Sequence, residues 1–241
     1  AFIYSTPKLY NLYVNNGDTK RFNWSIAPFE YKEAGGKNTG VTHREFEQGK
    51  LAEVMSQYGQ QRGTYQYADD TEKTTATKNF SRMCGKYRRE YEADKKDKNY
   101  TAINFPILRY ADVLLMIAEA ENEANNGPTT LAYQCMKEVR ERAGGTAFRI
   151  ESSDLTLALL QNERKIELAF EDHRFWDIRR WMIGDVVKDI YGVKVTKKGS
   201  KYSYTPVKIQ TRVWEEKMNL YPIAQSEIYK NGNLTQNDGW E

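Results

Sequence analysis

The chain has 241 residues, of which 39% are hydrophobic and 29% are charged. This apolar content can fill an ordinary core, so we expect one large globular domain or two small ones. The formal net charge of +3 is far below what a nucleic-acid-binding surface needs. With only 2 Cys and 2 His, the chain has little material for a metal site or a His-based triad. We therefore expect no nucleic-acid partner, no metal and no cofactor.

The start of the chain resembles the middle of a protein. The opening AFIYSTPKLY has no initial Met and lacks the basic and apolar regions of a signal peptide. No apolar run approaches the roughly 18 residues that span a bilayer. We expect a truncated or processed part of a longer protein.

Residues 1–103 are rich in aromatic side chains and are interrupted by clusters such as NNGD, AGGKNTG and GQQRGTYQY. Gly and Asn in such clusters are typical of turns, and patches such as LYNLYV suit strands. We expect loops around short strands and a few helical turns. The charged stretch YRREYEADKKDKNY then predicts a solvated linker.

A helical pattern begins after this linker. Pro106 suits the first turn of a helix, where its missing N–H would have no partner. Apolar residues then recur at i, i+3, i+4 and i+7 as far as about Asn125. Pro128 and Thr129 open a second helix, which the glycine pair at 144–145 ends. The two helices predict a hairpin of about the length of a tetratricopeptide repeat. The apolar face of the first helix comprises Ile107, Leu108, Ala111, Leu114, Leu115 and Ala118.

A third helix is expected to begin at Ser153 or Asp154, whose side-chain oxygens can cap free N–H groups, and to continue to Phe170. A fourth carries HRFWDIRRWMIGD. One hairpin cannot bury its own apolar face, so we expect two hairpins to stack. The strand-like and turn-rich remainder is expected to wrap back over the helices.

Four sequence blocks resemble the C-terminal region of the SusD/RagB family. They are NFPILRYADVLLMIAEAEN, EVRERAG, NERKIELAFEDHRFWDIRRW and LYPIAQSEIYKNGNLTQNDGW, in the family's order. The resemblance covers about residues 104–240 and is weak before them. The tail is a variant, because Ala224 and Asp238 stand where the family usually has proline.

The resemblance implies a mainly α fold of tetratricopeptide-like helical hairpins, with loop-rich segments and a few short β-strands, in a SusD-like α-α superhelix. We expect a loop and short-strand segment over residues 1–103 and the helical C-terminal region over residues 104–241. Together they would form one structural unit from which the N-terminal half of the family fold is absent.

The resemblance also implies a non-catalytic protein on the external face of the bacterial outer membrane. Such a protein binds oligosaccharides or polysaccharides and serves a SusC-like TonB-dependent transporter. Membrane association would depend on a lipid anchor that this chain does not contain.

An acidic stripe along the third helix, formed by Glu163, Glu167 and Glu171, needs cations beside it. Its carboxylates recur at i, i+4 and i+8, and paired carboxylates are what glycoside hydrolysis needs. Acids in one stripe repel one another unless cations face them, so we favour a structural ion-pair network over an active site. The network would comprise Glu163, Arg164, Glu167, Glu171, Arg174, Asp177, Arg179 and Arg180. The aromatic residues interleaved with it are interpreted as core: Phe175, Trp176 and Trp181.

Sugar capture needs a flat ring against the apolar face of a pyranose, with amides or Arg beside it to bond the hydroxyls. Aromatic residues among polar ones in the first hundred residues provide both. The candidate ligand-binding residues are Trp24, Phe29, Tyr58, Arg62, Tyr65 and Tyr67.

Two other functions stay open at this point. Tetratricopeptide-like hairpins also bind peptides, so the chain could be the peptide-binding component of a nutrient-import complex. A glycosidase is supported only by the acidic stripe.

Overall fold

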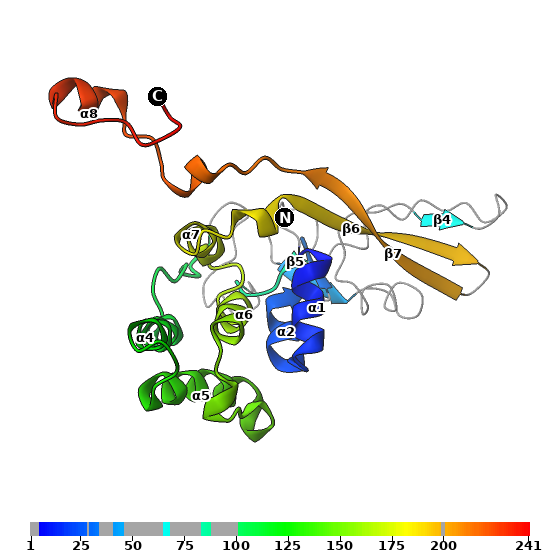
Figure 1. Ribbon diagram of the computed structural model, residues 1–241. Coiled ribbons are helices and arrows are strands. Elements are labelled where there is room, and N and C mark those ends of the chain that lie inside the picture. The colour runs from blue at the N-terminus through cyan, green and yellow to red at the C-terminus, as the bar shows by residue number, and fades with distance from the viewer. Residues whose placement is uncertain are drawn as a thin grey trace.

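The computed structural model describes residues 5–27, 29–33, 41–45, 65–67, 83–87, 101–198 and 201–241. Helices surround the main core, and a two-stranded ribbon extends away from them (Figure 1). The helices are α1 (Pro7–Asn15), α2 (Thr19–Ser25), α4 (Tyr110–Ala124), α5 (Thr130–Gly144), α6 (Leu157–Glu167), α7 (His173–Arg180) and α8 (Gln225–Lys230). The 3-10 helices are η3 (Gly145–Phe148), η4 (Ser152–Asp154), η5 (Gly184–Val187) and η6 (Glu216–Asn219). The strands are β1 (Ile26–Ala27), β2 (Phe29–Glu33), β3 (Val41–Glu45), β4 (Tyr65–Tyr67), β5 (Met83–Cys84), β6 (Asp189–Lys198) and β7 (Lys201–Thr211). The predicted mainly helical fold is confirmed.

The α4–α5 hairpin forms as its sequence predicts, except at its first turn. Thr129 caps α5, its hydroxyl accepting the Ala132 N–H at 3.1 Å. Helix α4 starts at Tyr110 rather than just after Pro106, because the Arg109 backbone is still extended (φ −129°, ψ 155°). Two residues predicted for the apolar face therefore precede the helix and are exposed: Ile107 and Leu108.

Helix α6 is shorter than predicted at both ends. Its N-cap is Thr156, which accepts the Leu159 N–H at 3.2 Å, while the expected start at Ser153 or Asp154 lies in η4. The helix ends at Glu167, and Phe170 follows with a left-handed backbone (φ 64°). A left-handed residue cannot continue a right-handed helix, so the chain turns here toward α7.

Two apolar clusters share α6. The larger lies between α4, α5 and α6, with Leu115, Met136 and Leu160 fully buried. The smaller joins α1, α2 and the end of α6, and the Tyr13 hydroxyl there donates to the Ile166 carbonyl at 2.7 Å. Helix α6 therefore connects the N-terminal helices to the α4–α5 hairpin.

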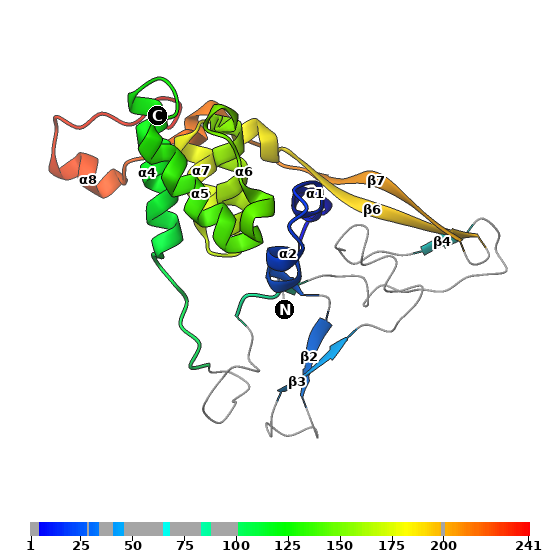
Figure 2. The same cartoon turned by 90° about the horizontal axis from the view of Figure 1, so that it is seen from below.

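Strands β6 and β7 form a long antiparallel ribbon, longer than the short strands expected, with a register shift at Ile190/Tyr191. Strand β4 pairs in parallel with β6. Separate antiparallel pairs join β1 to β5 and β2 to β3. The ribbon and β4 point away from the helices in both views (Figures 1 and 2).

The C-terminal tail covers the helices only in part. Its 3-10 helix η6 contacts α7, but α8 lies apart from α4–α7 in Figure 1. None of residues 212–241, all of which the structure describes, is buried. Beyond η6, Tyr221 still contacts α7, and the expectation that the tail wraps over the helices is wrong for the part that follows, including α8. Among the described helices, none is both long and apolar enough to cross a membrane.

Candidate functional site

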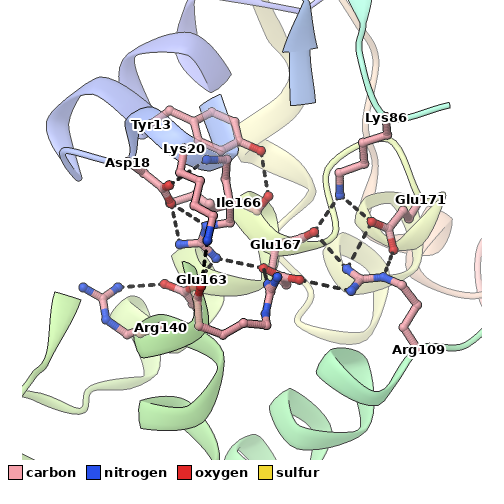
Figure 3. A network of polar contacts seen from close by, with 12 residues as sticks. Tyr13, Asp18, Lys20, Lys86, Arg109, Arg140, Glu163, Ile166, Glu167 and Glu171 are labelled. Atoms are coloured by element: carbon pink, nitrogen blue, oxygen red, sulfur yellow. Dashed lines mark hydrogen bonds and ion pairs between the residues drawn. The ribbon is translucent and has the colours of Figure 1, made fainter. Parts of the chain in front are cut away.

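The acidic stripe meets cations from distant parts of the chain (Figure 3). Glu163, at the centre of α6, has a side chain with no exposed surface. One of its oxygens accepts from the Arg21 guanidinium at 2.5 Å and the other from the Arg140 guanidinium at 2.7 Å. Arg21 also pairs with Asp18 at 2.5 Å. The carboxylate therefore ties α2 and α5 to α6.

One turn later, Glu167 accepts from three guanidinium groups: Arg21 at 2.9 Å, Arg142 at 2.7 Å and Arg109 at 3.1 Å. Glu171, just beyond the helix, accepts from Arg109 at 2.5 Å and also from the Lys86 ammonium. All four oxygens of these two carboxylates are hydrogen-bonded.

The surroundings of Glu167 keep its carboxyl group ionised. Burial alone would raise its pKa, but the guanidinium groups of Arg142, Arg21 and Arg109 outweigh burial and hold the pKa below its ordinary value. The pKa of Lys86 is also lowered, because burial outweighs the attraction of Glu171.

A second ion-pair group lies between α4, α6 and α7. Arg164 donates to Asp112 at 3.0 Å and to Asp177 at 3.2 Å. Arg180 donates to Asp177 at 2.9 Å and to Glu119 at 2.6 Å. The Trp181 indole N–H also donates to Glu119, at 2.6 Å. These contacts fix α7 against α4.

A pocket of about 340 Å³ opens beside the ion pairs of Glu167 and Glu171. Its volume lies at the lower end of the range for small-molecule sites. The lining includes the exposed Trp24 and also Tyr87, whose ring stacks on that of Phe105 with centroids 5.4 Å apart. The lining residues are Arg21, Trp24, Ser25, Lys86, Tyr87, Asn104, Pro106, Arg109, Arg142, Glu167 and Glu171.

Comparison with known proteins decides the family. The SusD family model, SusD_RagB, matches residues 1–240. The chain belongs to the SusD family. This match extends the resemblance of residues 104–240 to nearly the whole chain.

Two curated SusD-like relatives come from Formosa agariphila. SusD-like protein P25 is 36% identical over 137 residues, which are 55% of this chain and 23% of that protein. SusD-like protein P2 is 31% identical over 146 residues, which are 57% of this chain and 26% of that protein. The matched region thus spans about a quarter of each relative.

A crystal structure of a SusD-like protein from Bacteroides fragilis has the same fold. It superposes with a TM-score of 0.57 at 21% sequence identity, covering 98% of this chain and 47% of that protein. The SusD-family chain therefore spans about half the length of this solved relative.

Of the predicted sugar-binding residues that the structure describes, those in α2 and in β4 lie apart. Trp24 lines the pocket. Phe29 lies in β2, and Tyr65 and Tyr67 form the ends of β4, which stands beside the ribbon and apart from α2 in both views (Figures 1 and 2). Two further candidates, Tyr58 and Arg62, lie outside the described residues.

Two arginines predicted for the ion-pair network contact aromatic rings instead. The Arg179 guanidinium lies 3.8 Å from the centre of the Tyr221 ring. That of Arg174 lies 6.0 Å from the Trp181 ring, and one of its buried nitrogens has no hydrogen-bond partner among the described residues. The other six predicted members are paired with carboxylates or guanidinium groups as described above.

Phe175 and Trp176 are not core residues, contrary to the sequence interpretation. Both are exposed on α7, with centroids 5.4 Å apart, and Trp176 lies 6.3 Å from the Tyr221 ring. Helix α7 instead buries Asp177 and Ile178, so its apolar face is narrow.

None of the five cations that contact the acidic stripe in the described part of this SusD-family chain was predicted from the sequence. Only periodicity on α5 offered a signal: Arg140 follows Met136 at i+4, on the face toward α6. No local pattern marks the other cations, which are brought in by the fold: Arg21, Lys86, Arg109 and Arg142. Among the described residues, no group of His, Cys, Asp and Glu could hold a metal ion.

Lys165, elsewhere on α6, gives a pH-dependent prediction. Burial, with Arg174 and Lys8 nearby, lowers its pKa to about 8, whereas an unfolded lysine has a pKa of about 10.4. Between these values the unfolded chain binds more protons, so the free energy of unfolding should rise with pH. Lys165→Met should stabilise the protein by about 1 kcal/mol at pH 7, after allowance for partial exposure, and the gain should shrink toward pH 10.

Urea titrations at several pH values would measure this difference. Lys230→Met, at an exposed lysine paired with Glu227 at 2.8 Å, is the control and should show no such trend. An equal stability difference for Lys165→Met at pH 7 and pH 10 would contradict the prediction.

Proposed function

We propose that this SusD-family chain is part of a non-catalytic protein that binds oligosaccharides or polysaccharides on the external face of the bacterial outer membrane. The bound glycan would pass to a SusC-like TonB-dependent transporter. The match of the SusD family model to residues 1–240 carries this proposal, because it assigns nearly the whole chain to the family.

The pocket supports a location for glycan binding. The exposed Trp24 indole offers a flat apolar face, and Asn104 and Arg142 provide hydrogen-bonding groups in the same lining. A pyranose ring has an apolar C–H face and polar hydroxyls, which this combination suits.

The carboxylates in the pocket favour binding over hydrolysis. A glycosidase needs one carboxyl group that stays protonated until it donates its proton, which requires a raised pKa. Glu167 has a lowered pKa, and the oxygens of Glu167 and Glu171 are engaged by guanidinium and ammonium groups. This pair is therefore suited to holding helices together.

Replacing the indole tests the location. Trp24→Ala should weaken binding of any oligosaccharide that the chain binds by roughly three- to tenfold, because a ring contact is worth about 0.5–1.5 kcal/mol. Isothermal titration calorimetry would follow a screen of soluble plant, algal and host polysaccharides, with a reducing-sugar assay on each glycan bound. We expect binding without release of reducing ends.

Trp176→Ala is the matched control, because it removes an exposed tryptophan on α7 outside the pocket lining. Equal losses for the two variants would show that the site is not beside Trp24. Binding of peptides but of no glycan would overturn the proposed function in favour of a peptide-binding component.

A further inference from the structure

We infer that the pocket beside Trp24 selects anionic glycans, whose sugars carry carboxylate or sulfate groups. This inference rests on the proposed glycan-binding function and names the class of glycan. It starts from the charges in the lining. Two carboxylates, Glu167 and Glu171, face four basic side chains: Arg21, Lys86, Arg109 and Arg142.

Two of the four basic side chains lie much closer to the solvent than the carboxylates, whereas Arg21 is 9% and Lys86 is 14% exposed. The side chains of Glu167 and Glu171 are 4% and 3% exposed, whereas that of Arg109 is 28% and that of Arg142 is 56% exposed. The carboxylates thus lie beneath the cations that pair with them. A ligand entering the pocket would meet N–H groups rather than carboxylate oxygens.

Donors also remain after the ion pairs are formed. An arginine has five N–H groups, and in the described contacts Arg142 uses one of its Nη atoms, on Glu167. Lys86 has three N–H groups and donates to the Glu167 carbonyl at 2.7 Å and to the Glu171 carboxylate. Among the residues that the structure describes, the lining therefore offers spare hydrogen-bond donors, while its carboxylate oxygens are already bonded.

A lining with more available hydrogen-bond donors than acceptors suits carboxylates and sulfates better than neutral hydroxyls. A hydroxyl both donates and accepts, so a neutral sugar needs acceptors in its site as well as donors. Ionised carboxylate and sulfate groups only accept, and a guanidinium group can bind two of their oxygens at once. The indole of Trp24 in the same lining can contact the sugar ring that carries the charged group.

A matched pair of ligands tests the inference. Oligogalacturonate and its carboxyl-reduced counterpart differ only at C6, where a charged carboxylate stands in one and a neutral hydroxymethyl group in the other. A sulfated carrageenan oligosaccharide with its desulfated form provides the sulfate arm. We expect the intact chain to bind at least one charged member about tenfold or more tightly than its neutral partner. The difference should shrink as the salt concentration rises from 50 to 500 mM.

Arg142→Gln should lower the affinity for the charged ligand about three- to tenfold and that for the neutral ligand by less, because glutamine keeps a hydrogen-bonding amide but loses the charge. Arg142→Lys keeps the charge and should recover part of the loss. The control is Arg149→Gln, which removes a similarly exposed arginine paired with Glu141 at 2.7 Å outside the pocket. Far-ultraviolet circular dichroism would verify that each variant is folded.

The outcomes separate the two proposals. If neutral glycans bind as tightly as charged ones, and Trp24→Ala weakens their binding, this inference is overturned. The proposed function would still stand. A charge preference that survives Arg142→Gln and also Lys86→Met would overturn the placement in this pocket. Failure to bind any glycan, charged or neutral, would overturn the proposed function as well.

Discussion

Glu163→Gln is expected to lower the free energy of unfolding by about 3–5 kcal/mol, the cost typical of breaking a buried ion pair. The Glu163 side chain has no exposed surface, and its partners Arg21 and Arg140 are 9% and 8% exposed. Glutamine keeps the shape of the side chain but loses its charge. Both guanidinium groups would then stay buried with less negative charge beside them. Urea unfolding followed by tryptophan fluorescence would measure the change.

Glu227→Gln is the control for this variant. It removes a carboxylate that pairs with Lys230 at 2.8 Å, but both side chains are more than half exposed. Such surface pairs contribute about 0–1 kcal/mol. If Glu163→Gln were as mild as this control, the buried network would not stabilise the fold as we describe. Adding Arg140→Met to Glu163→Gln should recover part of the loss, because it removes one of the uncompensated charges.

Leu115→Ala is expected to cost about 2–5 kcal/mol, the range for a large-to-small substitution in a packed core. Leu115 is fully buried on α4, in the cluster that it forms with α5 and α6. The lost methyl groups would leave a cavity that surrounding helices can only partly fill. The midpoint of urea unfolding should fall while the dependence on urea concentration stays the same.

Leu220→Ala is the matched control in the tail, where the leucine is 59% exposed. It should change stability by less than about 0.5 kcal/mol. Comparable losses for the two leucines would mean that the core does not lie between α4, α5 and α6.

Local signals predicted the helical hairpin well. The turn between α4 and α5 and the Thr129 cap are determined by nearby residues, so the sequence was sufficient there. The start of α4 was missed for a tertiary reason. Arg109 directs its guanidinium group to Glu167 and Glu171, and its backbone stays extended where the apolar pattern alone would continue the helix.

The site could be predicted only in part, because its components are distant in the chain. The acidic stripe is visible in the sequence, but Arg21 is 142 residues away from Glu163. Periodicity describes one element at a time and cannot say which cation will face a carboxylate from another. Trp24 was found because an aromatic residue beside polar ones suits a sugar, yet its position next to the ion pairs required the fold.

Helix α6 contributes to both apolar clusters, and this affects the order in which the chain folds. The α4–α5 hairpin closes over a short turn, whereas α2 can reach α6 only by closing a loop of more than a hundred residues. Closing a longer loop costs more entropy, and contacts between distant residues tend to form late. Until α2 arrives, Glu163 lacks Arg21, so late docking of the N-terminal helices would complete the neutralisation of the charge on α6.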